Sequence, residues 1–231
     1  MQLTLNTEII ADMMCMKERV VDKEELIGRL LKRFGENAPI FISEIAEEWG
    51  EYSRSRVFQL LREMLKDGMI AKGDNGIYYL PTVTLTGQRS VLGHEDIIDK
   101  RFIYSGDDIF GYYSGLSLLN GLHLTTQMPF RIELVTSNAS ATVRKIEVDG
   151  FPITVRRSKV KISKKNVYAL MLLEAFTEMR RPLKGREIVY MKEFAESRKI
   201  RKEDVVRYSR YFPLYTMKSI LDTGLDNVFT R

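Results

Sequence analysis

Residues 40–80 read IFISEIAEEWGEYSRSRVFQLLREMLKDGMIAKGDNGIYYL and are the part of the chain whose structure is most directly predicted. From Ser53 to Lys66, apolar residues recur every three or four positions, which places them on one helix face: Val57, Leu60, Leu61, Met64 and Leu65. Ser53 is a residue type that favours the N-cap, and Gly68 stands where a left-handed residue often ends a helix. The sequence therefore predicts a helix with both ends marked.

Two further elements flank this helix. Residues 43–49 form a shorter amphipathic segment, which predicts a helix followed by a tight turn at Gly50. Downstream, Gly73-Asp74-Asn75-Gly76 separates the apolar runs 69–71 and 77–80, and Asn-Gly between apolar runs is a strong β-hairpin signal. The order of helix, turn, helix and hairpin predicts a winged helix-turn-helix.

Residues 1–81 form the predicted first domain. Asp22 is the expected N-cap of a helix from Lys23 to Phe34, and this helix completes a three-helix core. We assign no element to residues 1–16, because their apolar residues follow no clear period.

The outward face and first turn of the predicted helix over 53–66 carry polar and basic side chains. A recognition helix uses such side chains to contact phosphates and base edges in a major groove. We expect Gln59 to contact a base edge and Lys72, in the hairpin, to contact the DNA backbone. A solvated charged surface is the plainer alternative. The predicted DNA-binding residues are Ser53, Arg54, Ser55, Arg56, Gln59, Arg62, Lys66 and Lys72.

Composition limits the function classes. The chain has 231 residues, 44% of them hydrophobic, which is enough for two domains with separate cores. Its formal net charge of +5 favours polyanionic partners. A single cysteine, Cys15, excludes an internal disulfide framework and fits a reducing compartment. Since no apolar run approaches the roughly 20 residues that span a bilayer, we expect a cytoplasmic protein without a membrane partner.

The remainder predicts an α+β domain over 94–231, joined to the first by a linker over 82–93. Helices are expected over His94–Lys100 and from Asp107 or Asp108, through Tyr112 and Tyr113, to Gly121. Asp149-Gly150 predicts a second hairpin. The other expected elements are strands over 130–136, 141–148 and 151–157, and helices over 166–179, 187–198, 202–211 and 214–222.

One stretch resembles a known family. Residues 110–129 read FGYYSGLSLLNGLHLTTQMP, and this is similar to the YGYxxGxxxxNxxGLTTQxP motif that follows an N-terminal winged helix in the AbiEi-like antitoxins. Two positions depart from the motif, with Phe110 in place of tyrosine and His123 in place of glycine. Glycine tolerates a positive φ angle far better than histidine, so the second departure affects the expected turn.

The resemblance implies an antitoxin of a type IV toxin-antitoxin pair that also represses its own operon. The implied partners are double-stranded operator DNA, bound at inverted repeats, and a nucleotidyltransferase-like toxin that is often countered without a stable complex. No cofactor is implied.

A candidate antitoxin surface combines the motif with basic residues further along the chain. Aromatic and amide side chains can serve binding, although Gln127 and its neighbours could equally cap the local backbone. The basic residues follow the Asp149-Gly150 hairpin and could contact DNA or RNA phosphates, or could merely be solvated. The candidate residues are Tyr112, Tyr113, Asn120, Gln127, Arg156, Arg157 and Lys159.

Two alternatives remain. The first is a winged-helix transcriptional regulator with a ligand-sensing second domain. The second is a metal-dependent nuclease, for which Glu133, Glu147 and Asp149 with Lys145 are the candidate residues. Strand alternation turns Lys145 and Glu147 toward solvent, and the chain lacks the common catalytic motifs. We therefore expect no enzyme activity, no catalytic residues and no bound metal.

Overall fold

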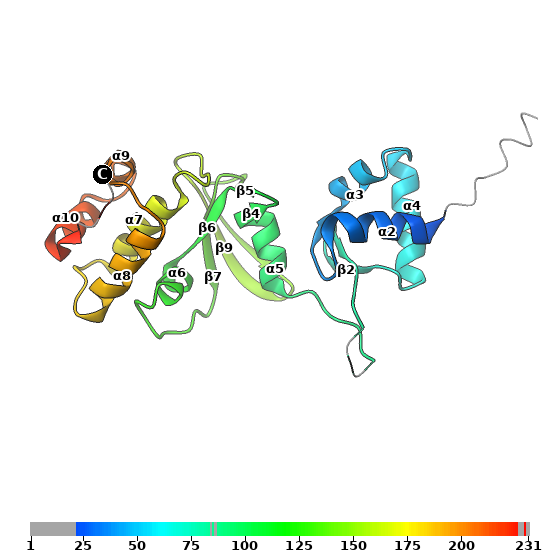
Figure 1. Ribbon diagram of the computed structural model, residues 1–231, viewed down its shortest axis with the longest axis horizontal. Helices are drawn as coiled ribbons and strands as arrows, with labels where there is room; N and C mark the ends of the chain where they lie inside the picture. Colours follow the sequence, from blue (N-terminus) through cyan, green and yellow to red (C-terminus); the bar gives the residue numbers. More distant parts are fainter. Residues whose placement is uncertain (1–21, 84, 86, 226–228, 230–231) are drawn as a thin grey trace, which may run out of the picture. The chain divides into compact units, whose positions relative to one another are not determined.

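The computed structural model describes residues 22–83, 85, 87–225 and 229. The chain divides into two compact units, Met1–Leu92 and Gly93–Arg231, and each unit has its own hydrophobic core (Figure 1). Helices and sheets occur in both units, so the fold class is α+β, as predicted. Cys15 and residues 1–16, to which no element was assigned, lie outside the described residues.

The first unit contains three helices, α2 (Lys23–Phe34), α3 (Ile42–Glu48) and α4 (Arg54–Lys66). The Asp22 carboxylate caps α2 by accepting the backbone N–H groups of Glu24 and Glu25 at 3.0 and 3.1 Å. Ser53 caps α4, and Gly68 has φ +72° just beyond its end. The predicted helices and their end signals are therefore confirmed, with bounds shifted by one residue in α3 and α4.

A three-stranded antiparallel sheet completes this unit, in the order β1 (Ile40–Phe41), β3 (Ile77–Tyr79), β2 (Ala71–Asp74). The predicted hairpin is confirmed. The edge strand β1 was not predicted, because two residues are too few to show a period. Trp49 and Leu60, both with 0% exposure, lie at the centre of the core between the helices and the sheet.

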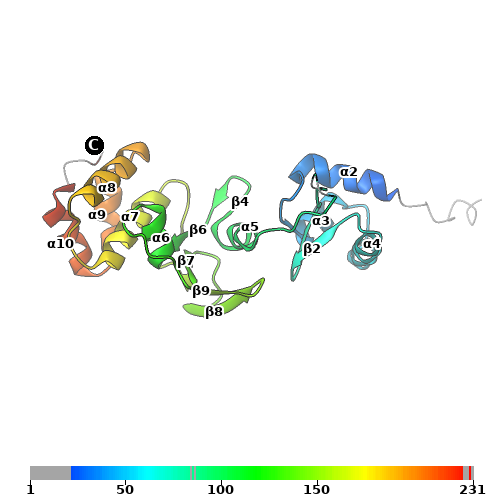
Figure 2. The ribbon, with the colours of Figure 1, turned by 90° about the horizontal axis from the view of Figure 1, so that it is seen from below.

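The second unit is built on a four-stranded sheet in the order β6 (Gly111–Ser114), β7 (Ile132–Thr136), β9 (Phe151–Arg157), β8 (Val143–Val148), as Figure 2 shows. Only β7 and β9 among these neighbours are parallel. A short ribbon, β4 (Tyr104–Ser105) and β5 (Asp108–Ile109), accompanies the sheet. Asp149 and Gly150 have φ of +48° and +77°, so the predicted hairpin turn is confirmed.

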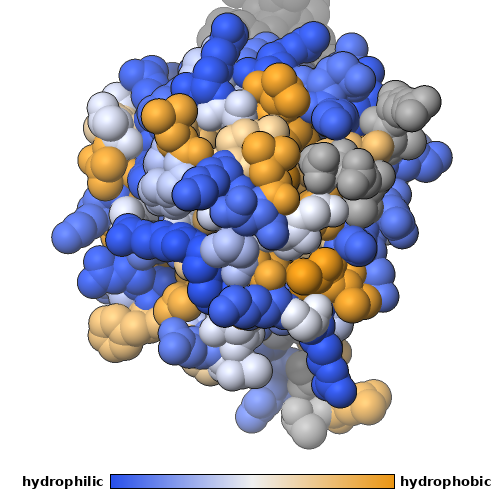
Figure 3. Space-filling view, turned by 90° about the vertical axis from the view of Figure 1, so that its left-hand side faces the viewer, coloured by the Kyte–Doolittle hydropathy of each residue, from blue (hydrophilic) through white to orange (hydrophobic). Residues whose placement is uncertain are grey.

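Helices cover both faces of this sheet. On one side lie α5 (His94–Ile98) and the π-helix η1 (Asp99–Ile103); on the other lie α6 (Gly115–Gly121) and α7 (Val167–Met179), as Figure 1 shows. Helices α8 (Arg186–Ser197), α9 (Lys202–Ser209) and α10 (Leu214–Thr223) pack against α7. Space-filling atoms at the α8–α10 end show hydrophobic side chains in separate patches among hydrophilic ones (Figure 3).

The helix predicted from Asp107 or Asp108 to Gly121 is wrong over its first half, which forms β5 and β6. The apolar residues here have a helical spacing, but Gly111–Ser114 pair with β7 instead, since tyrosines fit a pleated sheet well. A Cβ atom on Gly111 would lie 1.9 Å from the Phe102 carbonyl oxygen, so only glycine lets this strand approach η1. Gly115, with φ +56°, marks the change from strand to helix.

Candidate functional site

The outer face of α4 carries the polar side chains that the sequence predicted there. Val57, Leu60, Leu61 and Met64 are buried, and Ser55, Gln59, Arg62 and Lys66 project from the opposite side and are exposed. The Ser53 hydroxyl accepts the backbone N–H of Arg56 at 3.3 Å, which fixes the first turn. The face is therefore a rigid helical surface rather than a loop.

Ion pairing distinguishes three cations of α2 from the cations of α4 and β2. On α2, Lys23 pairs with Asp67 at 2.8 Å, while Arg29 and Arg33 pair with acidic residues of the α3 region: Glu47, Glu48 and Glu51. Hydrogen bonding by Arg33 lowers the pKa of the Glu48 carboxyl. Within the part of the chain that the structure describes, Arg54, Arg56, Arg62, Lys66 and Lys72 make no ion pair.

The side chains on α4 differ in how they are held. Arg56 is partly buried and donates to Oε1 of Gln59 at 3.3 Å, whereas Arg54 and Arg62 are exposed. Lys72 is exposed on β2. Unpaired cations beside a hydrogen-bonding amide are suited to contact phosphates and a base edge.

A buried polar network joins the sheet of the second unit to α7. The Ser114 hydroxyl donates to Oε1 of Glu174 at 2.6 Å, and Arg156 donates to both Ser114 and Glu174. Glu174 is 3% exposed, although it is a charged residue on α7. Arg156, predicted as a surface cation, is half-buried and paired. Nothing in the sequence pattern pointed to Ser114, because its partners come from strands and helices distant in the chain.

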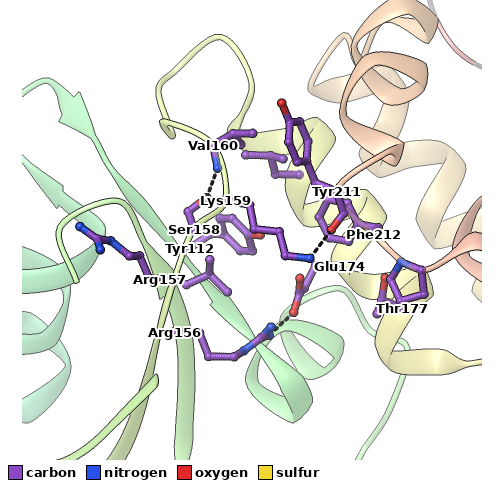
Figure 4. A pocket seen from close by; sticks show the side chains of 13 residues that line it. Tyr112, Arg156, Arg157, Ser158, Lys159, Val160, Glu174, Thr177, Tyr211 and Phe212 are labelled. Carbon is purple, nitrogen blue, oxygen red and sulfur yellow. Dashed lines mark hydrogen bonds and ion pairs between the residues drawn. The ribbon is translucent and has the colours of Figure 1, made fainter. Parts of the chain in front are cut away.

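A pocket of about 260 Å³ opens beside this network, between the sheet, α7 and the loop from α9 to α10 (Figure 4). Tyr112 lines the pocket and is 4% exposed; burial raises the pKa of its hydroxyl, and Glu174 adds to the rise. Lys159 crosses the pocket to donate to the backbone carbonyl of Tyr211 at 2.9 Å. The Arg157 side chain points away from these groups in Figure 4.

The predicted antitoxin residues do not share one surface. Tyr112 faces α7, while the next residue on the strand, Tyr113, faces η1 and donates to Asp99 at 2.6 Å. Asn120 donates to the Gln127 carbonyl at 3.3 Å, and Thr125 accepts the Gln127 backbone N–H at 3.2 Å. Thr125 therefore caps the local backbone, as the capping alternative predicted for this segment, and Asn120, predicted for the antitoxin surface, also holds the loop.

The motif does border a groove with a second basic cluster. His123–Gln127 form one wall of an open hollow of about 580 Å³, and the start of α8 forms the other. Arg181 pairs with Glu187 at 2.7 Å, whereas Lys184 and Arg186 make no ion pair within the described residues. His123 has φ +58°, so the turn keeps the left-handed conformation that glycine favours in the family motif.

The residues considered for a nuclease are dispersed. Lys145 and Glu147 are exposed on β8, and Asp149 is exposed in the turn that follows; the predicted outward face of β8 is confirmed. Glu133 lies on β7 and is partly buried. Among the residues that the structure describes, no three His, Cys, Asp or Glu side chains converge closely enough to hold a metal ion.

No protein-family model matches the chain, and no curated protein matches it significantly. Over the described residues, no helix combines the length and apolarity needed to cross a bilayer.

Proposed function

We propose that the protein is a DNA-binding repressor whose first unit is a winged helix-turn-helix. In this proposal α4 is the recognition helix and the β2–β3 hairpin is the wing. One observation carries it: three of the four cations of α2 (Lys23, Arg29 and Arg33) pair with neighbouring acids, whereas all the cations of α4 and β2 make no ion pair among the described residues. Unpaired cations gathered on one helical face are suited to phosphate contact and counterion release.

The experiment measures repression and checks folding of the variant. A reporter driven by the DNA upstream of the protein's own gene is expressed with the full chain or with the Arg54→Ala/Arg56→Ala/Arg62→Ala variant. The variant should lose repression while keeping the wild-type circular dichroism spectrum. Full repression by a folded triple variant would remove α4 as the DNA contact.

The second unit acts, in this proposal, as an antitoxin against a nucleotidyltransferase-like toxin. The support is the resemblance of residues 110–129 to the AbiEi-like motif, together with the position of His123–Gln127 opposite Lys184 and Arg186 in the open groove. A groove with unpaired cations suits a nucleic acid that the toxin also uses.

Co-expression with a nucleotidyltransferase-like toxin in growing cells tests this role. The full chain should relieve growth arrest, and Lys184→Glu/Arg186→Glu should abolish relief. The matched control is Lys202→Glu/Arg207→Glu, which reverses two exposed charges on α9. If the groove variant and the control relieve growth arrest equally, the groove is not the antitoxin surface.

A ligand-sensing regulator is the second candidate function. The pocket beside Arg156 and Glu174 favours it, because a concave site with apolar walls and a few convergent polar groups is typical of small-molecule binding. This function is tested by measuring the affinity of the protein for operator DNA with and without a ligand in the pocket.

A further inference from the structure

The pocket of Figure 4 is lined by a phenol whose hydroxyl has no partner. The Tyr112 residue is 4% exposed, and its hydroxyl makes no hydrogen bond among the described residues. The hydroxyl is not sealed off, because the side chain lines the pocket. An occupant of the pocket could therefore satisfy it.

Charge determines what kind of occupant fits. The buried Glu174 carboxylate pairs with Arg156, whose guanidinium also lies 3.8 Å from Glu178, a residue that does not line the pocket. Lys159 pairs with no acidic side chain among the described residues, and its ammonium donates to the neutral carbonyl oxygen of Tyr211. The ammonium lies across the pocket in Figure 4, and its flexible stem allows it to turn toward a ligand. The donors considered for an occupant are thus Lys159 and the Tyr112 phenol. Arg157 also lines the pocket, but its side chain points away in Figure 4, and the Ser158 hydroxyl accepts the backbone N–H of Val160 at 3.3 Å.

Val135, Leu170 and Phe212 give the pocket apolar walls, beside the polar residues Ser158 and Thr177. The volume of about 260 Å³ lies below the roughly 300–1,000 Å³ typical of drug-sized ligands, so the occupant is small. An apolar body would bury against these walls while an anionic group met the donors.

We infer that this pocket binds a small organic anion, a carboxylate or phosphate monoester carried on an apolar body, through Lys159 and the Tyr112 hydroxyl. Only the regulatory role of such binding rests on the proposal that the protein is a ligand-sensing regulator. Binding itself requires neither DNA recognition nor antitoxin activity.

Isothermal titration calorimetry of the full chain tests the inference with phenyl phosphate and benzoate as probes. At least one should bind at least tenfold more tightly than inorganic phosphate or phenol, because only the probes combine both parts. Lys159→Gln should weaken binding about tenfold, and Tyr112→Phe about fivefold, as expected for a charged and a neutral hydrogen bond. Lys161→Gln is the matched control: Lys161 is exposed nearby but does not line the pocket.

Each outcome bears on the inference. Probe binding that weakens in both pocket variants and not in Lys161→Gln supports it. Absence of binding by both probes, or equal binding by all folded variants, overturns it, as does inorganic phosphate binding as tightly as the tighter of the two probes. Operator affinity is measured on the same samples without a probe, so loss of DNA binding is seen separately. If Lys159→Gln does not fold, the inference is tested by the loss of probe affinity in Tyr112→Phe and by the affinity of the probes relative to phenol.

Discussion

The guanidinium of Arg156 on β9 pairs with the carboxylate of Glu174 on α7, and the carboxylate also accepts a hydrogen bond from Ser114 on β6. One buried acid therefore connects two strands of the sheet to the helix that covers them. Glu178, one turn further along α7, lies 3.8 Å from the same guanidinium. Burial and the negative charge of Glu174 raise the pKa of Glu178.

Removing one partner of this pair should be costly. Glu174→Leu leaves Arg156 half-buried beside an apolar side chain, and we expect it to lower the free energy of unfolding by about 2–4 kcal/mol. Urea unfolding followed by circular dichroism measures this loss. The double variant Glu174→Leu/Arg156→Met should recover part of the stability, because no half-buried cation is left beside an apolar side chain, while the partly exposed Glu178 loses only its 3.8 Å contact with Arg156. A double variant as unstable as the single one would show that the pair itself is strongly stabilising.

The left-handed conformation of His123 predicts a stabilising substitution. A non-glycine residue with φ +58° bears a strain of about 1 kcal/mol, and glycine removes that strain. His123→Gly should therefore raise the midpoint of urea unfolding, with a gain below about 1 kcal/mol after the entropy of the unfolded glycine is subtracted. His123→Ala is the control, since alanine keeps the Cβ atom. If both variants lower the midpoint equally, contact with Tyr190 matters more than backbone strain.

Asp99 predicts the sign of one pH effect. Desolvation raises the pKa of its carboxyl, although the hydrogen bond from Tyr113 opposes the rise. The folded state then binds the proton more tightly than the unfolded state, so this group's contribution to stability is lost as pH rises through the folded pKa. Asp99→Asn should make the protein more stable at pH 7 and flatten the decline in stability between mildly acidic and neutral pH.

Asp107 provides the opposite case. Hydrogen bonding by Lys164 lowers the pKa of this exposed carboxyl, so its contribution is present above the unfolded pKa and is lost as pH falls. Asp107→Asn should leave the profile near pH 7 almost unchanged, because exposed pairs contribute little. A neutral-pH gain in Asp107→Asn as large as that in Asp99→Asn would contradict the role of burial.

Local signals in the sequence predicted the first unit well. Asp22 and Ser53 mark helix starts through their own side chains, and Gly68 marks an end through its φ angle, so no distant residue is needed. The exposed polar face of α4 follows from the same period that buries Val57. By contrast, the short strand β1 exists only because it pairs with β3.

The second unit exposes the limits of periodicity. Tyr112 and Tyr113 fit a helical spacing, yet pairing with β7 and the close approach of Gly111 to η1 make them a strand. Their opposite orientation then separates residues that the motif places side by side. The ion pair between Arg156 and Glu174 could not be predicted from the sequence either, because it depends on how the sheet and α7 pack.

Fluorescence anisotropy with a duplex from upstream of the protein's gene measures whether α4 contacts DNA, through the salt dependence of binding. If α4 is the recognition helix, replacing Arg54, Arg62 and Lys66 with alanine weakens binding by the full chain and reduces the slope of log K against log salt by up to about 0.9 per lost phosphate contact. The control triple Lys202→Ala/Arg207→Ala/Lys218→Ala removes equal charge from exposed positions on α9 and α10, and its slope should equal that of the wild type. Identical slopes for all three proteins would contradict α4 as the DNA-binding helix.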